Sequence, residues 1–341
     1  MEVATKPARK LLFPLFAAAF AISACSTPQT PHSPEPVQEP LLAEEYAEMD
    51  DGYRLPLAQW APEGEPKAVV LALHGFNDYH KAFADVGPTL AEQGILTYAY
   101  DQRGFGRTET HGEWSSAERM VDDAQAMLEL LKARHPDLPV YLMGESMGGA
   151  VTISALAAED APEIDGAVLI APAVWARTTM PWYQRAGLWV AEKVAPNWRP
   201  TGKSLGRVAS NNRDALIALG RDPLVIKKTS IDAVSGLTDL MDLALRSSPK
   251  LEVPTLVLYG ENDQIVPKHP VCQMLQSEPV TDPWTLGLYP DGYHMLTRDL
   301  QGQRVVADIA SWIEAPRNEL PSGHEADNIA WKQRVCGQTS A

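Results

Sequence analysis

LMGESMGGA, residues 142–150, places Ser146 between one glycine and a pair of glycines. An apolar run precedes this stretch and small residues follow it, so it is a G-x-S-x-G pattern at the junction of a predicted strand and a predicted helix. Such a tight turn strains the serine and pushes its hydroxyl outward, while the helix N-terminus favours negative charge beside it. The pattern predicts that Ser146 is a nucleophile; a purely structural serine in a glycine-rich turn is the alternative.

The segments around this turn alternate between short apolar runs and longer periodic ones. Strands are predicted at 69–73, 95–100, 140–143, 167–170, 255–259 and 285–289, after a hairpin over 46–60 that turns at Asp51-Gly52. Helices are predicted near 83–93, 117–133, 147–158, 267–276 and 298–313. Nearly continuous apolar strands are typical of a parallel sheet buried on both faces. We therefore predict an α/β fold with a mostly parallel central sheet covered by helices on both faces.

The alternation stops over residues 172–249, where no convincing strand is found. This segment is predicted to be an inserted helical cap, and it contains four of the nine tryptophans. These are Trp175, Trp182, Trp189 and Trp198. A helical stripe is formed by Trp182, Ala186, Trp189, Val190 and Val194. Packing of the tryptophans between cap and body is one interpretation, and lining of an apolar acyl-chain pocket is the other.

A serine nucleophile needs a base, and the base needs an acid that orients it. In a site of this kind the chain order is serine, acid, histidine. Asp263 directly follows a predicted buried strand, and His294 lies in the loop after the last predicted strand. Because the carboxyl ends of parallel strands meet at one edge of the sheet, both side chains are predicted to converge on Ser146. The alternatives are a turn-capping role for Asp263, a loop histidine without function, and Asp291 as the acid.

Two backbone N–H groups are predicted to form an oxyanion hole. One belongs to Met147, the residue after the nucleophile, and the other to Phe76, in the loop that follows an early strand. His74 precedes the serine in the chain, so we expect it to brace this loop rather than to act as the base.

Five motifs together resemble the α/β-hydrolases of the monoacylglycerol lipase and lysophospholipase type, often grouped with serine aminopeptidase-like hydrolases. They lie at 74–80, 101–107, 144–149, 260–267 and 291–294, within a similarity over about 50–314. The resemblance implies that the serine attacks an ester carbonyl and that a cap receives the acyl chain. It also implies that Asp101 and Arg103 brace the loop near the oxyanion strand. The tail after Glu314 and a lipid anchor depart from the common pattern of the family.

The composition excludes some classes of function. A formal charge of −15, spread along the 341 residues, argues against nucleic-acid binding and against attachment to an anionic membrane by charge alone. The sequence has neither HExxH nor a paired cysteine cluster, so we expect no metal and no cofactor. It does not indicate an oligomeric state.

The N-terminus has the pattern of an export signal. Lys6, Arg9 and Lys10 precede an apolar stretch that ends in Ile-Ser-Ala-Cys at Cys25. This ending resembles the lipobox of bacterial lipoproteins, which implies a signal peptide over 1–24, lipidation of Cys25 and, because Ser26 follows, the outer membrane. An ordinary signal peptide is the alternative. The proline-rich residues 25–45 are predicted to be a tether between a lipid anchor and the folded body.

Cys272 and Cys336 remain after lipidation of Cys25. In an oxidising compartment they are predicted to form a disulfide that ties down the C-terminal tail, residues 315–341; two reduced thiols are the alternative. The hydrolase core is then expected at 46–171 and 250–314, interrupted by the cap at 172–249.

The predicted activity is hydrolysis of a lipid-like ester, either a monoacylglycerol or a lysophospholipid, through an acyl-enzyme on Ser146. The same triad would serve a short-chain carboxylesterase, a peptidase, an acyltransferase or a cofactor-free haloperoxidase. An alternative of another class is a lipid-anchored binding protein on an inactive hydrolase fold, which predicts a missing triad residue or a blocked pocket.

Overall fold

The computed structural model describes residues 36–201, 206–277, 284–316 and 318–337. The predicted signal peptide, Cys25 and residues 25–35 of the predicted tether lie outside these ranges. Residues 33–341 form one compact unit, which contains both the sheet and the segment predicted to be the cap.

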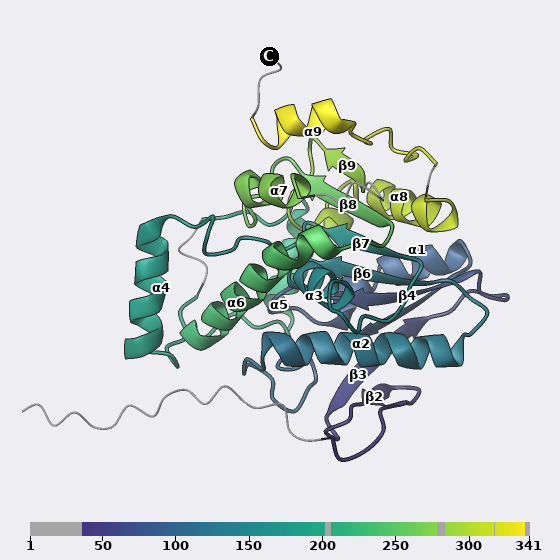
Figure 1. Ribbon diagram of the computed structural model, residues 1–341, viewed down its shortest axis with the longest axis horizontal. Helices are drawn as coiled ribbons and strands as arrows, with labels where there is room; N and C mark the ends of the chain where they lie inside the picture. Colours follow the sequence, from purple (N-terminus) through teal and green to yellow (C-terminus); the bar gives the residue numbers. More distant parts are fainter. Residues whose placement is uncertain (1–35, 202–205, 278–283, 317, 338–341) are drawn as a thin grey trace, which may run out of the picture. The chain divides into compact units, whose positions relative to one another are not determined.

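A single sheet of nine strands runs through the described part of the chain (Figure 1). Its order is β1-β2-β3-β5-β4-β6-β7-β8-β9, and all pairs from β5 to β9 are parallel. The strands are β1 (Leu41–Leu42), β2 (Tyr46–Glu48), β3 (Arg54–Trp60), β4 (Ala68–Leu73), β5 (Ile95–Tyr100), β6 (Val140–Glu145), β7 (Gly166–Ile170), β8 (Thr255–Gly260) and β9 (Thr285–Tyr289). Every residue of β4, β5, β6, β7 and β8 is buried, as continuous apolar strands require.

Helices pack against both faces of the sheet. On one face, α2 (Ala117–Arg134), α3 (Met147–Leu156), α6 (Ile231–Ser247) and α7 (Lys268–Leu275) contribute to one apolar cluster. On the other face, α1 (Val86–Glu92) and α8 (Gly302–Glu314) contribute to a second. The predicted α/β fold with a doubly covered, mostly parallel sheet is confirmed.

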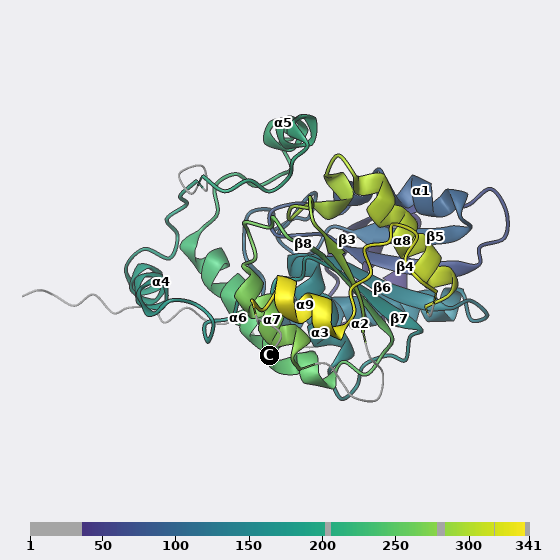
Figure 2. The same cartoon turned by 90° about the horizontal axis from the view of Figure 1, so that it is seen from above.

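The segment between β7 and β8 is helical, without a strand in its described residues. It comprises α4 (Trp182–Val194), α5 (Arg213–Arg221) and α6. Helix α6 packs on α3, and α4 packs on α6. As a result α4 and α5 stand away from the sheet, which Figure 2 shows from above.

The apolar stripe of α4 faces solvent. The exposed fractions of Trp182, Trp189 and Val194 are 77%, 63% and 78%. Trp198, just after the helix, is 62% exposed. Neither predicted role, core packing or pocket lining, therefore applies to these three tryptophans. The opposite face of the helix is the one that contacts α6, and Glu192 on it accepts a hydrogen bond from Ser235 at 2.9 Å.

The ordered body begins earlier than Tyr46, which corrects the end of the predicted tether. Leu41 and Leu42 pair antiparallel with β2, and the backbone N–H groups of Val37 and Gln38 donate to the carbonyl of Asp50. The edge of a β-hairpin leaves backbone groups unpaired, and this apolar pair adds a short strand that satisfies them.

The C-terminal residues are likewise part of the fold. Leu288 of β9 donates its backbone N–H to His324, and Ala326 donates to Leu286, so the segment covers the open edge of the sheet. A helix that the sequence analysis did not predict, α9 (Asn328–Arg334), follows. The structure then joins Cys336 to Cys272 of α7 in a disulfide, with a Cα–Cα distance of 5.2 Å.

Candidate active site

Ser146 occupies the turn between β6 and α3. Its φ and ψ angles are 55° and −112°, a backbone conformation that L-residues rarely adopt, and the turn is held by a 2.9 Å hydrogen bond from its N–H to the carbonyl of Ile170. A Cβ on Gly148 would collide with the carbonyl oxygen of Leu73, so glycine allows α3 to approach β4 closely. The sequence thus creates the strained serine at a strand-to-helix turn that G-x-S-x-G predicts, and the residue is largely buried, at 9% exposure.

The three predicted side chains lie within hydrogen-bonding distance of one another. The Nε2 atom of His294 is 2.9 Å from the Oγ atom of Ser146. On the other side of the ring, Nδ1 is 2.7 Å from Oδ2 of Asp263. The residues come from the ends of β6, β8 and β9, where strand topology was expected to bring them together.

Asp263 holds both its own turn and the histidine. Its Oδ1 atom accepts hydrogen bonds from the backbone N–H groups of Ile265 and Val266, at 2.7 and 3.0 Å. These bonds fix the carboxylate so that Oδ2 faces His294. Asp291, the competing acid in the sequence, is exposed at the surface.

The environment of His294 favours its protonated form. Burial of the ring disfavours the imidazolium, but the charge of Asp263 and its hydrogen bond outweigh burial and raise the pKa of His294 above its usual value of 6.5. Asp263 therefore stabilises the protonated form of the His294 ring.

The loop after β4 lies directly beside the nucleophile. A Cβ placed on Gly75 would be 3.3 Å from the Cβ of Ser146, so only a glycine lets the backbone pass this close without displacing a neighbour. Phe76 follows in this loop, and its ring packs on Phe105. Met147 is the first residue of α3, where a backbone N–H has no partner within the helix. The two predicted oxyanion donors thus belong to segments that flank Ser146.

Buried polar contacts brace this loop. The Nδ1 atom of His74 is 2.9 Å from the carbonyl of Gly75, and its Nε2 atom accepts the backbone N–H of Gln102 at 3.0 Å. Asp101 accepts hydrogen bonds from the backbone N–H of His80, at 2.9 Å, and from its ring. His74 and Asp101 thus have the bracing roles that were expected of them.

Arg103 has a different role from the one that the resemblance implies. The hydrogen bonds of its guanidinium go to Asp51 of the N-terminal hairpin and to Asp123 of α2 rather than to the loop after β4. Burial raises the pKa of Asp123 to about 6 against the opposing effect of Arg103. Arg103 thus joins the N-terminal hairpin to α2, which covers the sheet.

Three charged residues beside the triad were not singled out from the sequence. Arg298 donates to Asp78 and to Glu145, with both N–O distances 2.6 Å. Glu145 was noted only as the variable position of G-x-S-x-G. No spacing rule connects positions separated by 220 and 153 residues in the chain.

A largely apolar cavity of about 530 Å³ opens onto Ser146 and His294. Its apolar lining includes Phe76, Trp175, Met180, Leu237, Met241 and Val266, from the loop after β4, the cap and the turn after β8. Trp175 is the one tryptophan of the four that lines it. A cavity of this size and polarity is suited to an apolar organic group held next to the nucleophile.

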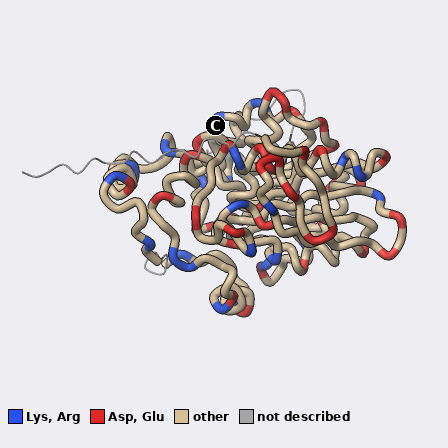
Figure 3. The backbone as a smooth tube through the Cα atoms, turned by 90° about the horizontal axis from the view of Figure 1, so that it is seen from below, with Lys and Arg blue, Asp and Glu red and all other residues tan. Residues whose placement is uncertain are grey.

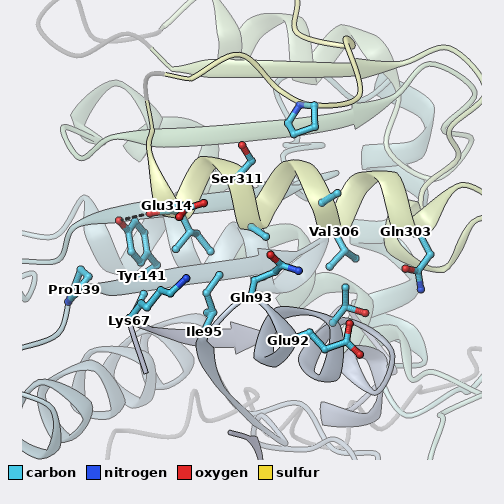
Figure 4. A pocket seen from close by; sticks show the side chains of 16 residues that line it. Lys67, Glu92, Gln93, Ile95, Pro139, Tyr141, Gln303, Val306, Ser311 and Glu314 are labelled. Carbon is cyan, nitrogen blue, oxygen red and sulfur yellow. Dashed lines mark hydrogen bonds between the residues drawn. The ribbon is translucent and has the colours of Figure 1, made fainter. Parts of the chain in front are cut away.

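A second cavity, of about 720 Å³, lies between α1 and α8 (Figure 4). It is bordered by the first residues of β4 and β5, at the amino-terminal ends of the strands, whereas Ser146 lies at the carboxyl-terminal ends. Lys67, Glu92 and Glu314 lie around it, and Tyr141 donates its hydroxyl to the carbonyl of Ile313. This mixture contains no nucleophile paired with a base.

Two structural features are absent from the described residues. Within them, no helix is long and apolar enough to cross a membrane. In the same ranges, no group of three or more His, Cys, Asp and Glu side chains is arranged to hold a metal ion.

Comparison with known proteins identifies the family. A profile of the family described as serine aminopeptidase, S33, matches residues 64–301, which include all three triad residues. The chain therefore belongs to this family of α/β-hydrolases.

Curated relatives and solved structures agree with that assignment. Monoglyceride lipase from Mus musculus is 30% identical over 274 residues, covering 77% of this chain and 88% of the mouse protein. Monoacylglycerol lipase from Mycolicibacterium smegmatis is 27% identical over 278 residues, covering 77% and 93%. A soluble variant of monoglyceride lipase from Saccharomyces cerevisiae, solved with a substrate analogue, has the same fold, with a TM-score of 0.68, 21% identity and coverage of 85% and 99%. The chain is a carboxylic ester hydrolase.

Proposed function

We propose that this protein hydrolyses the ester of a monoacylglycerol or lysophospholipid through an acyl-enzyme on Ser146. The observation that carries the proposal is the hydrogen-bonded series Ser146–His294–Asp263, which opens into a largely apolar cavity. The hydrogen-bonded series supports nucleophilic attack by Ser146, and the apolar cavity supports a lipid-like substrate.

In the first half of the cycle, Nε2 of His294 removes the proton of the Ser146 hydroxyl as the oxygen attacks the ester carbonyl. The carbonyl oxygen becomes an oxyanion, which accepts hydrogen bonds from the N–H groups of Met147 and Phe76. The ring then gives its proton to the leaving alcohol, and the acyl group stays on Ser146. Loss of one oxyanion donor is expected to cost about 3 kcal/mol of transition-state stabilisation.

In the second half, water takes the place of the alcohol. His294 removes a proton from water, the hydroxide attacks the acyl-enzyme, and the ring returns the proton to Ser146 as the fatty acid leaves. Asp263 keeps the proton of the neutral ring on Nδ1 throughout, which leaves Nε2 free to accept.

The apolar cavity and the names of the relatives support a lipid ester as substrate. Met180, Leu237 and Met241 surround the approach to Ser146 with flexible apolar side chains that adapt to an acyl chain. Polar and charged side chains also line the cavity, among them Asn77, Asp78 and Arg207, which suits an alcohol or a headgroup.

The outer face of α4 supports action at a lipid surface. Trp182, Tyr183 and Trp189 are exposed there, and amphipathic aromatic side chains are favoured at membrane–water interfaces. Residues 172–230 contain ten Lys and Arg but three Asp and Glu, a formal charge of +7 in a chain of −15. Figure 3 marks basic residues along α4 and the loop after it. We propose that this face contacts an anionic bilayer, and that the cavity receives its substrate from there.

Anchoring at the outer membrane of a bacterial envelope through Cys25 belongs to the same proposal. Its support is the lipobox-like sequence before Cys25 and the proline-rich residues that follow. The lipid anchor would keep the aromatic face of α4 near the bilayer even if either contact alone were weak.

The test is a panel of monoacylglycerols, lysophospholipids, p-nitrophenyl esters of graded chain length and aminopeptidase substrates, assayed with wild type and Ser146→Ala. The expected result is a preference for longer acyl chains, and loss of both turnover and fluorophosphonate labelling in Ser146→Ala. Persistent labelling would assign the nucleophile elsewhere. A preference for the shortest esters would favour the short-chain carboxylesterase, and cleavage of the peptide substrates alone would favour the peptidase.

A further inference from the structure

One guanidinium joins the three segments that carry the catalytic groups. Arg298 lies four residues after His294, at the end of a 3-10 helix over Leu296–Arg298. Glu145 directly precedes Ser146, and Asp78 follows Phe76 by two residues. We propose that Arg298 is a positioning residue, which holds the loop of Phe76 at the correct distance from Ser146 and His294. The inference rests on the proposed mechanism, because that mechanism makes the backbone N–H of Phe76 an oxyanion donor.

The geometry of the contacts matches the fork of an arginine. One terminal nitrogen, Nη1, donates to Oδ2 of Asp78, and the other, Nη2, donates to Oε1 of Glu145, both at 2.6 Å. The two carboxylates come from separate segments, so the planar group fixes their separation as well as pairing their charges. A lysine ammonium has one charged atom on a flexible stem and cannot impose that separation in the same way.

The arrangement is removed from solvent. The side chains of Arg298, Asp78 and Glu145 are 14%, 10% and 2% exposed. Burial alone would lower the pKa of Arg298, but the two carboxylates outweigh it and raise the pKa above its usual value. A buried ion pair is sensitive to loss of one partner, because the remaining charges stay in a poorly solvated site.

The loop is held at both its ends and its middle: His74 bonds Gln102, Asn77 donates to Thr229 of the cap, and Asp78 pairs with Arg298 on the side of the triad. Gly75 approaches the serine without a side chain, and Asn77 has a φ of 68°, a conformation rarely adopted by residues with a Cβ. A backbone in that conformation is retained only where surrounding contacts hold it. Asp78 is the adjacent residue, so its ion pair with Arg298 joins this strained position to the segments of Ser146 and His294.

The same residues affect the catalytic base. The charged groups acting on His294 are Asp263 from the turn after β8, Glu145 from the end of β6 and Arg298 from its own loop. Asp263 and Glu145 raise the pKa of His294, whereas Arg298 lowers it. Removing the arginine or Glu145 should therefore move the acid limb of the pH profile in opposite directions, which a purely structural role would not do.

The experiment compares Arg298→Met, Arg298→Lys and Glu145→Gln with wild type, using a soluble p-nitrophenyl ester. Fluorophosphonate titration counts the competent active sites, so that kcat is expressed per site. For Arg298→Met we expect kcat per site to fall about 10- to 100-fold with KM within about threefold, because a misplaced oxyanion donor affects the transition state more than the bound ester. Affinity for a trifluoromethyl ketone, whose adduct has the same oxyanion, should fall in parallel.

The pH profiles separate charge from geometry. The acid limb of kcat/KM should move to higher pH in Arg298→Met and to lower pH in Glu145→Gln. Arg298→Lys retains the positive charge, so its limb should stay near that of wild type while kcat remains reduced. Arg304→Met is the matched control, because Arg304 is exposed on α8 and donates to Gln301, and it should leave all these quantities unchanged.

The proposal is overturned if kcat per titrated site stays within twofold of wild type in both Arg298 variants. It is also overturned if activity falls only in proportion to the number of competent sites, which would indicate a folding role. If Arg298→Met does not fold, Arg298→Lys and Glu145→Gln still decide the question. Failure of the proposed mechanism is seen separately, as labelling that persists in Ser146→Ala.

Discussion

Trp312 on α8 and Trp189 on α4 are the same residue type on two amphipathic helices, but their surroundings are opposite. Trp312 is 1% exposed and packs with the apolar cluster on one face of the sheet, whereas Trp189 is 63% exposed. The hydrolase body encloses its apolar side chains, and the outer face of the cap presents them to solvent. An apolar stripe therefore predicts a helix with a face to cover, and does not by itself identify the covering partner.

The cap and the hydrolase body also differ in charge. Residues 172–249, the cap, contain eleven Lys and Arg and six Asp and Glu, a formal charge of +5, which leaves −20 on the rest of the chain. The overall charge of −15 hides this separation of charge between the cap and the body. If the body performs the chemistry and the cap contacts the lipid, substitutions in the two regions should affect different measurements.

The largest expected effect is on chemistry in the body. Asp263→Asn should lower kcat by about 10⁴-fold on every ester, soluble or membrane-bound, because the amide no longer favours the ring tautomer that accepts the serine proton. The measurement is kcat with a short p-nitrophenyl ester. Asp291→Asn is the control, and activity that depended on Asp291 instead would show that the acid had been assigned wrongly.

A pair of tryptophan substitutions compares the two regions directly. Trp312→Ala should reduce the free energy of unfolding by about 3–5 kcal/mol, because it leaves a cavity in a close-packed core. Trp189→Ala should change it by no more than about 0.5 kcal/mol. Denaturant unfolding measures both values.

The same Trp189→Ala protein is then tested for lipid contact. We expect its binding to phosphatidylglycerol vesicles to weaken roughly tenfold, with unchanged turnover of a soluble ester, because one apolar side chain no longer enters the interface. Phosphatidylcholine vesicles control for the contribution of charge. Unaltered vesicle binding, or a large loss of stability, would contradict the assignment of α4 as a lipid-facing surface.

The smallest expected effect is a shift in pH dependence. His294 must be neutral to accept a proton, and its pKa is raised above 6.5, so kcat/KM should rise with pH through a midpoint above 6.5. Stability has the opposite sign: the contribution of this residue is complete below 6.5 and is lost as the pH rises through the folded-state pKa. A midpoint below 6.5 in the pH–rate profile would mean that burial, rather than Asp263, dominates the site.

Much of the body could be predicted because its signals are local. Continuous apolar runs marked β4 to β9, and the G-x-S-x-G turn placed Ser146 between a strand and a helix. Asp263 and His294 followed from chain order together with the rule that parallel strands end at one edge. Each step used only neighbouring residues and general topology.

The missed features depend on partners that are distant in the chain. Arg298 pairs with residues 220 and 153 positions away, and neither pairing has a fixed spacing. Leu41 and Leu42 looked like part of a proline-rich tether because two apolar residues are too few to predict a strand. The exposed face of α4 was missed because periodicity carries no information about solvent.

The sequence by itself determined the alternation of strands and helices, the turn that carries Ser146, and the choice of Asp263 and His294 as candidate acid and base, since these follow from local pattern and chain order. Only the tertiary structure decided that Arg298 pairs with both Asp78 and Glu145, that the tail covers the edge of β9, and that the tryptophans of α4 face outward. The physical reason is that burial and ion pairing are properties of the space around a side chain, and that space is filled by residues far away in the chain.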